Sequence, residues 1–350
     1  MRYLTRIAVF FCLAAMLLPA TVRPFETDQY NLPTTPLADI GDEVSEYVEQ
    51  NLRAAVDEIN ADIRRHQACL TVVSRRSDCH SPEKETTELT ELRSNDAVAK
   101  ALYERLGDGT MLVTKFGGWF RGHKFKAQPA TYYTSFKDSI YIALPTDYWT
   151  ISPTIKMYGV EFGTDKLEHL FQQGYRYYKI ERGEAAITIV PGRSVKKAVK
   201  WGQNSERTFY GFFVSGVYSN ADLAANFAGM RFYQRLTSPV KIGETTEQPL
   251  LSLKEGVWQF NTANLRDELL KPFLSDHLNE ALNPSVYAFN LYPVVKSVVQ
   301  NHSCAEWHKA YPNLSRSILE QKTNDLELWH GEDYGNSQKE RMVRIADTCF

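Results

Sequence analysis

Hydrophobic residues recur at steps of three and four along much of this chain, which is the pattern of amphipathic helices. The clearest case is the segment 42–66, whose apolar positions are Val44, Val48, Leu52, Val56, Ile59 and Ile63. A second helix is predicted from Ser94, a good N-cap residue, through Leu106, with Gly107 as its stop signal. From Thr164 onward the helical pattern returns and persists over most of the remaining chain.

The stretch between these helical regions has a different pattern. "TMLVTKF" and "TYYTSFKDSIYIAL" are rich in Thr, Tyr, Val and Ile and predict strands, and Lys137-Asp138 could turn the second into a hairpin. Between them, "GGWFRGHKFK" is basic and aromatic; we expect a solvated loop, with a binding loop as the alternative. The polar segment 80–93 is also expected to be a loop. The predicted fold class is mainly α (α+β), a helical bundle core with a small antiparallel sheet near residues 110–145.

The chain begins with the pattern of an export signal over residues 1–20: a short basic start, an apolar run and a small residue at the end. The apolar run is too short to favour a spanning helix, although a retained anchor is the alternative. After it we expect a leader or linker over 21–41, a core domain over 42–240, and a C-terminal helical region over 241–350 packed on the core. No later segment offers the roughly 20 apolar residues of a membrane span, so none is expected in the mature chain.

Four cysteines would remain after removal of the signal, and an even number in an exported chain suggests disulfides. Cys69 and Cys79 flank a short segment that a local bridge could close, which leaves Cys304 for Cys349. Three pairings are formally open, and we favour Cys69–Cys79 with Cys304–Cys349. Their spacing does not resemble a zinc site. The expected location is therefore secreted or periplasmic.

Charge argues against one class of partner. The chain has 40 basic and 42 acidic residues and a net charge of -2, so its overall charge does not favour binding to nucleic acid. The expected partner is instead an envelope component.

The candidate chemistry begins with "GTDKLEHLFQQGYRY", in which Thr164 is a plausible N-cap and Asp165 follows in the first turn. At about 100° per residue, Asp165 and His169 share one face of the helix, opposite an apolar face. An Asp and a His four positions apart can hold a metal or share a proton. A merely solvated helix face is the other interpretation.

Two further helices carry polar groups where apolar ones are expected. After a cap at Ser194, Glu206 lies on the apolar stripe of its helix and needs a partner from another element. In "SNADLAANFAGMRFYQRL", Ser219 and Asp222 have the spacing of a capping box. There Asp222 and Asn226 face inward beside Gly229, which permits close helix contact, whereas Arg231 and Arg235 are expected to mark the solvent side.

These groups could form one pocket. His169 would be the general base or ligand, Asp165 or Asp222 would orient it, and Glu206 with a raised pKa could act as an acid. Lys166 and Asn226 would contribute binding groups. A His with three carboxylates would also suit a divalent metal, so the metal candidates are Asp165, His169, Glu206 and Asp222.

The ordered series Asp165-Lys166-x-x-His169, Glu206, and Ser219-x-x-Asp222-x-x-x-Asn226-x-x-Gly229 resembles the motifs of VanZ-like proteins. It also resembles soluble exported relatives of unknown function that share an Asp-Lys-x-x-His helix. The resemblance covers about residues 160–235. It implies a polar site at these positions and names no reaction.

His277 and Glu280 lie three apart on a predicted helix in the C-terminal part and could be ligands, although a surface pair is the favoured interpretation.

The sequence leaves open whether the protein is an enzyme. The favoured hypothesis is an exported envelope protein whose buried polar cluster of Asp165, His169, Glu206, Asp222 and Asn226 locks helices together. The first alternative is a hydrolase-like enzyme that uses this cluster as an acid–base or metal site on an envelope glycan, peptide or lipid headgroup. The second is a small-ligand binding protein.

Overall fold

The computed structural model describes residues 26–71, 79–110, 113–143, 148, 151–184, 194–208, 211–212 and 215–350. The predicted export signal over residues 1–20 lies outside these. The longer α-helices are α2 (Gly41–Thr71), α3 (Pro82–Leu92), α4 (Asn95–Leu106), α5 (Lys115–Gly122), α7 (Thr164–Glu181), α8 (Val195–Glu206), α9 (Asn220–Arg235) and α13 (Arg316–Asp325). Shorter helices are α10 (Arg266–Leu269), α11 (Tyr292–Val298), α12 (Cys304–Ala310) and α14 (Ile345–Cys349).

The sheets of the described chain are two-stranded and antiparallel. They pair β1 (Gly109–Thr110) with β2 (Val113–Thr114), β3 (Thr154–Met157) with β4 (Val160–Gly163), β5 (Val217–Tyr218) with β10 (Val286–Tyr287), β6 (Val240–Ile242) with β7 (Thr245–Glu247), and β8 (Leu251–Lys254) with β9 (Val257–Phe260). The predicted class, mainly helical with small antiparallel sheets, is confirmed. The hairpin predicted around Lys137-Asp138 is wrong, because that segment forms the 3-10 turns η1 (Phe136–Asp138) and η2 (Ile140–Ala143).

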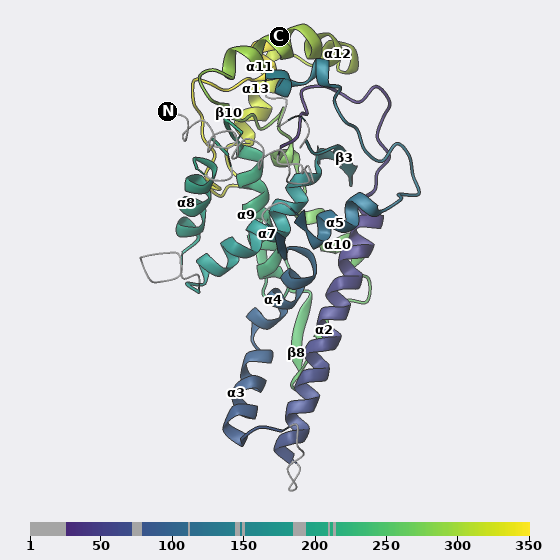
Figure 1. The fold of residues 1–350 in the computed structure, drawn as a ribbon, viewed down its shortest axis with the longest axis vertical. Helices are drawn as coiled ribbons and strands as arrows, with labels where there is room; N and C mark the ends of the chain where they lie inside the picture. The colour runs from purple at the N-terminus through teal and green to yellow at the C-terminus, as the bar shows by residue number, and fades with distance from the viewer. Residues whose placement is uncertain are drawn as a thin grey trace, which may run out of the picture.

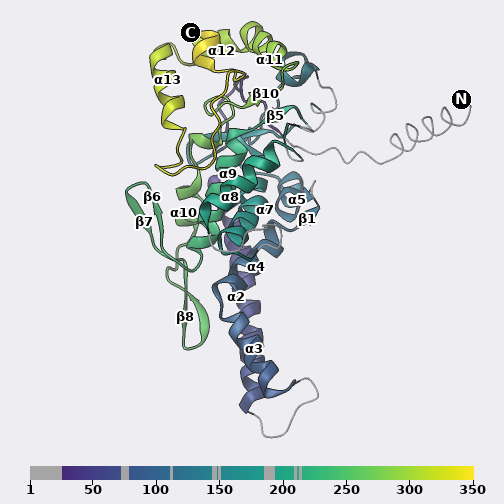
Figure 2. The same cartoon turned by 90° about the vertical axis from the view of Figure 1, so that its left-hand side faces the viewer.

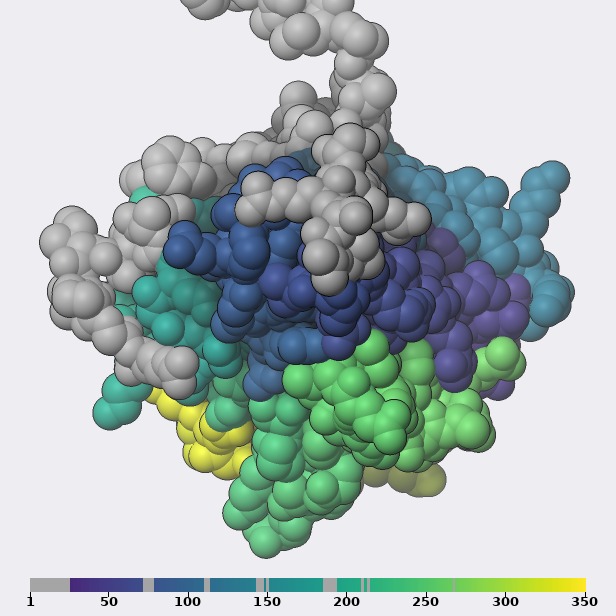
Figure 3. Space-filling model, turned by 90° about the horizontal axis from the view of Figure 1, so that it is seen from below, coloured from purple at the N-terminus to yellow at the C-terminus, as the bar shows by residue number. Residues whose placement is uncertain are grey.

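The predicted long amphipathic helix is α2, and its apolar stripe is buried from Val44 to Ile63. Together with α3 it forms a stalk that projects from the rest of the molecule (Figure 1). Seen from below, green residues lie against the purple and blue residues of this stalk (Figure 3), and among them strand β9 contacts α2. The Asn60 side chain fixes the contact, because it donates to the carbonyl of Trp258 and accepts from the amide of the same residue, both at 2.8 Å.

The segment 80–93, predicted as a loop, contains helix α3 instead. Its start carries a local signal, because the Ser81 side chain accepts from the Lys84 amide and Pro82 occupies the first turn. Its position is set by distant partners. The Glu85 carboxylate bonds to the His66 ring of α2, and the Cys69–Cys79 disulfide, with a Cα–Cα distance of 5.5 Å, ties the end of α2 to this helix. The predicted pairing is therefore confirmed.

Helices α7, α8 and α9 pack side by side in the middle of the molecule (Figure 2). Helices α7 and α9 cross most closely where Gly174 faces Gly229. A Cβ atom at Gly229 would lie 2.1 Å from the Leu170 carbonyl oxygen, so the backbones can approach this closely only with glycine there. The prediction that Gly229 permits close helix contact is confirmed.

Helix α9 begins as predicted, with the Ser219 side chain accepting from the amide of Asp222 at 3.0 Å. The expectation that Arg235 marks a solvent face is wrong. Its side chain is buried, donates to the Gln248 carbonyl at 3.2 Å and pairs with the Glu247 carboxylate at 2.8 Å. Helix α9 is central, so Arg235 at its last position is enclosed and paired.

The C-terminal helices α11 to α14 cover the end of the molecule opposite the stalk (Figure 1). They surround a second apolar cluster that includes Tyr30, Tyr141 and Tyr287. The segment 26–31, expected within the leader or linker, is buried here, and the Trp307 ring N–H donates to the Tyr30 carbonyl at 2.8 Å. The predicted disulfide Cys304–Cys349 is present, with a Cα–Cα distance of 4.9 Å. Among the residues described, no helix has the length and apolar character that crossing a membrane requires.

Candidate functional site

A lysine ammonium lies at the centre of the candidate site. The Lys166 side chain is fully buried, with 0% exposure. Its Nζ atom donates to Asp165 Oδ2 at 2.6 Å, to Asp222 Oδ1 at 2.5 Å and to Glu280 Oε1 at 2.5 Å. An ammonium has three protons, so these three acceptors use its full hydrogen-bonding capacity. The arrangement is a tripod of carboxylates around one cation.

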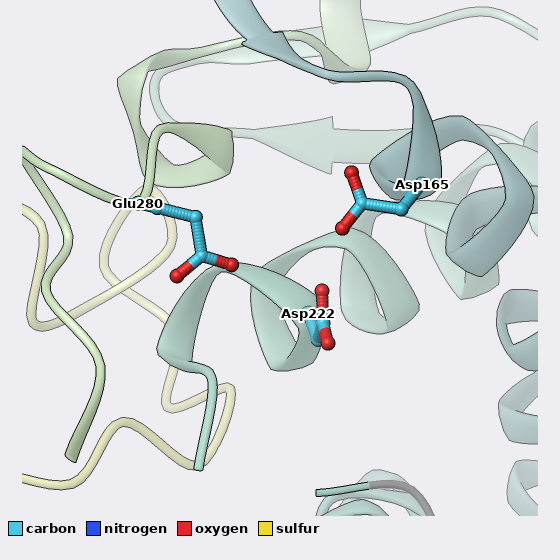
Figure 4. A group of neighbouring side chains, drawn as sticks. All are labelled: Asp165, Asp222 and Glu280. Atoms are coloured by element: carbon cyan, nitrogen blue, oxygen red, sulfur yellow. The ribbon is translucent and has the colours of Figure 1, made fainter. Parts of the chain in front are cut away.

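Three separate elements supply the tripod. Asp165 and Lys166 lie in the first turn of α7, Asp222 lies in the first turn of α9, and Glu280 lies just after the 3-10 turn η4 (Asp276–Leu278). Figure 4 shows the three carboxylates pointing toward one another from these elements. The close crossing of α7 and α9 brings their N-terminal turns within reach of one side chain.

A ring of hydroxyl groups completes the tripod. Thr27 Oγ1 donates to Asp165 Oδ1 at 2.6 Å, and Ser285 Oγ donates to Glu280 Oε2 at 2.6 Å. Ser219 Oγ, which caps α9, also donates to Glu280 Oε1 at 2.8 Å. Charge-assisted hydrogen bonds of this kind offset much of the cost of removing carboxylates from water.

The predicted His169 and Asn226 stand beside the tripod. His169 Nδ1 lies 3.0 Å from Asn226 Oδ1, and His169 Nε2 lies 3.4 Å from Asp222 Oδ2. Both neighbours are oxygen acceptors, so a ring with protons on both nitrogens would donate to both. With 16% of its side chain exposed, His169 is the most accessible member of the group.

Two more buried acids flank the tripod. Glu206 Oε2 accepts from the Ser219 amide at 3.4 Å, and Glu26 Oε1 accepts from Ser215 Oγ at 3.1 Å. Within the described chain, the second carboxyl oxygen of each has no hydrogen-bond partner. Burial first, and then the charge of Asp222, raises the pKa of both groups well above its usual value. Both acids therefore favour the protonated form.

The electrostatics of the tripod follow from the same balance. Burial lowers the pKa of the Lys166 ammonium, but the charges of Asp165, Asp222 and Glu280 outweigh that effect and raise it well above its usual value. Burial likewise raises the pKa of the Glu280 carboxyl, although the Lys166 charge opposes the shift. These shifts favour the charged form of the Lys166 ammonium and the protonated form of the Glu280 carboxyl.

Most residues that the sequence analysis assigned to one site do meet in the structure. Asp165, Lys166, His169, Asp222 and Asn226 are joined by direct contacts, as expected of one shared site. Glu206 lies close enough for the charges of Asp222 and Lys166 to shift its pKa, but it bonds to none of these side chains.

Two acids of the group were not predicted as members of it. Glu26 lies in the segment expected to be a leader or linker. Glu280 was assigned with His277 to a surface pair on a helix, which is wrong: both are buried, and they lie in or beside a 3-10 turn. His277 bonds instead to Ser275 Oγ and the Leu328 carbonyl, each at 2.9 Å. An irregular segment has no periodicity that would reveal which side chains face inward, so no sequence signal identified Glu280.

The oxygen atoms of Asp165, Asp222 and Glu280 lie within 4.8 Å of one another, a spacing that a metal ion could bridge. In this structure the Lys166 ammonium bonds to all three. A divalent ion on the same oxygens would have to displace a fully buried lysine. The tripod therefore fits its own ammonium as the resident cation better than a metal.

The tripod does not open onto three surface cavities found in the described residues. One cavity lies near the C-terminus beside Lys296 and Arg341, one lies between α5 and α7, and one lies beside Trp307. None of these three is lined by Lys166 or by any of its carboxylate partners. Comparison with protein-family models, with curated proteins and with solved structures gives no match to this chain.

Proposed function

We propose that this protein is an exported, non-catalytic envelope protein in which the Lys166 tripod locks separate parts of the chain into one arrangement. The observation that carries the proposal is the fully buried Lys166 ammonium with all three of its protons bonded to carboxylates. Any other packing of these segments would separate Lys166 from one of its carboxylates and leave a buried charge without its partner. Such packings are therefore strongly disfavoured.

The lock connects segments that are far apart in sequence. Thr27, Asp165, Asp222 and Glu280 belong to the N-terminal segment, α7, α9 and the turn region after η4. Their enclosure argues against turnover at this place, because a substrate must reach a catalytic group. His169 is the most accessible member of the group, and its nitrogens already face Asn226 and Asp222.

Two features of the chain indicate export. Residues 1–20 have the composition of a signal peptide, and the two disulfides suit an oxidising compartment. We infer a secreted or periplasmic location, with an envelope component as the partner. Fractionation of cells that express the full chain tests this inference: the mature protein should begin near residue 21 and leave the cytoplasm.

The lock itself is tested with Lys166→Met, which keeps the length of the side chain and removes its charge. We expect a loss of about 3–5 kcal/mol in the free energy of unfolding, measured by urea denaturation. Lys200→Met is the matched control, because Lys200 is an exposed residue of α8 and its substitution should change little. If Lys166→Met is as stable as the control variant, the tripod is not a lock.

The hydrolase alternative makes a different prediction. It requires hydrolysis of an envelope glycan, peptide or lipid headgroup by the purified protein, and loss of that activity in a folded His169→Ala variant. Under the lock hypothesis the wild type shows no such hydrolysis, and Lys166→Met is far more destabilising than His169→Ala. A stably folded but inactive His169→Ala variant would refute the non-catalytic proposal.

A further inference from the structure

The face of the first α7 turn that points away from the tripod lines a cavity of about 580 Å³. Asp165, Lys166 and His169 point to the tripod, whereas Thr164 and Glu168 of the same turn line this cavity. Its other walls come from α5 and from the segment that follows α5. The basic and aromatic stretch "GGWFRGHKFK", expected as a solvated loop, therefore forms helix α5 and one side of a pocket. A volume of this size is typical of small-ligand sites, at roughly 300–1,000 Å³.

Part of the cavity wall is apolar. Phe116, Phe120, Phe125, Ile151 and Pro153 all line this part of it. The aromatic residues pack on other rings: the ring centroids of Phe120 and Phe125 lie 5.0 Å apart, and Phe116 packs on Phe171 of α7 at 5.0 Å. A ligand that fits this part of the cavity needs an apolar side chain.

The inner end of the cavity carries a half-satisfied carboxylate. Glu168 Oε2 accepts from Thr114 Oγ1 at 2.9 Å and from the Thr114 amide at 3.3 Å. Glu168 Oε1 has no hydrogen-bond partner in the described chain and lies against Gly117, where a Cβ atom would come within 2.3 Å of it. Gly117 thus leaves room for the carboxylate at the cavity wall. Burial raises the pKa of this carboxyl, although its hydrogen bonds from Thr114 and the charge of Arg121 oppose the shift.

The rim of the cavity carries the opposite charge. Arg121 and Lys124 are exposed, line the cavity and form no ion pair or hydrogen bond in the part of the chain that the structure describes. The cavity therefore offers a largely buried carboxylate, an apolar section of wall, and two exposed cations that bond to no side chain of the described residues.

We propose that this cavity binds a zwitterionic amino acid or short peptide with an apolar side chain, its ammonium at Glu168 and its carboxylate at Arg121 and Lys124. This charge order distinguishes the ligand from other candidates. A purely apolar ligand would leave Glu168 unpaired, and an acidic sugar has no cation to place against it. The site is separate from the lock, and it stands or falls independently of it.

Calorimetric titration of the mature chain with leucyl-leucine tests the proposal. Binding is expected, and both N-acetylation and C-terminal amidation of the dipeptide should weaken it about tenfold or more, because each removes a charge-assisted contact. These comparisons between dipeptides use the unmodified protein. Absence of binding at millimolar dipeptide, or equal affinity for the N-acetylated form, would overturn the assignment.

Variants then locate the contacts. Glu168→Gln keeps an oxygen for the Thr114 hydrogen bonds, and it should bind free and N-acetylated dipeptide equally. Arg121→Gln should reduce discrimination against the amidated form. Lys137→Gln, which removes an exposed cation outside the cavity, is the control and should retain wild-type discrimination. Binding of galacturonic acid in place of the dipeptide would refute the proposal and identify an acidic-sugar site.

Discussion

Glu206→Gln offers the sharpest measurement on the buried acids beside the tripod. The Glu206 side chain is 1% exposed, and its Oε1 atom has no hydrogen-bond partner among the described residues. Burial, reinforced by the charge of Asp222, raises its pKa well above the ordinary value of 4.5. Glutamine has nearly the same shape and stays neutral at every pH, so the substitution removes one titration and little else.

The expected effect has a definite sign. Because the pKa is higher in the folded state, the native protein keeps a proton that the unfolded chain releases above pH 4.5. The stability from this group is complete below pH 4.5 and declines as pH rises toward the folded pKa, by about 1.4 kcal/mol per pH unit. Glu206→Gln should therefore match the wild type at low pH and become relatively more stable as pH increases. Over two pH units within this window the difference reaches about 3 kcal/mol.

Urea denaturation at pH 5, 6 and 7, followed by the fluorescence of the 6 tryptophans, measures this difference directly. The matched control is Glu244→Gln, an exposed acid in the turn between β6 and β7, which should run parallel to the wild type. If Glu206→Gln also ran parallel to the wild type, Glu206 would titrate normally and the reasoning from burial would fail. A wild-type advantage that grows with pH would contradict the sign.

Three other predictions concern the scaffold. Gly229→Ala should lower the free energy of unfolding, measured by urea denaturation, by about 2 kcal/mol or more, because the new Cβ would meet the Leu170 carbonyl. The control Gly122→Ala, whose Cβ would meet nothing within 4 Å, should be neutral or slightly stabilising. Burial lowers the pKa of His277 from 6.5 to about 4. The stability that the neutral ring contributes is therefore complete above pH 6.5, and about 3 kcal/mol of it is lost as the pH falls from 6.5 through 4. NMR titration of the ring should give a midpoint near 4. The disulfides differ in sequence separation, 45 against 10 residues, so Cys304→Ser should cost about 4 kcal/mol and Cys69→Ser about 3 kcal/mol in thermal unfolding experiments, and equal losses would contradict this loop-entropy argument.

Local patterns predicted the parts of this fold that depend on near neighbours. The three-and-four spacing of apolar residues located α2, and Ser94 and Gly107 bracket α4 as predicted. Cysteine spacing identified both disulfides. In α9, the inward position of Asp222 and Asn226 could be recognised because both lie beside Gly229 on a regular helix. Each of these inferences needs only the geometry of one element.

The centre of the site required contacts that no single element contains. A lysine is among the most hydrophilic side chains, and nothing near Lys166 in sequence indicates that it is fully buried; its partners Asp222 and Glu280 lie 56 and 114 positions away. Glu280 follows a short 3-10 turn, where no periodicity shows which way a side chain faces. Burial of a charge is favourable only once its counter-charges are in place, so tertiary packing alone could turn Asp165, Asp222 and Glu280 into one tripod. The chain encoded the participants locally, and their assembly depended on how α7 and α9 cross.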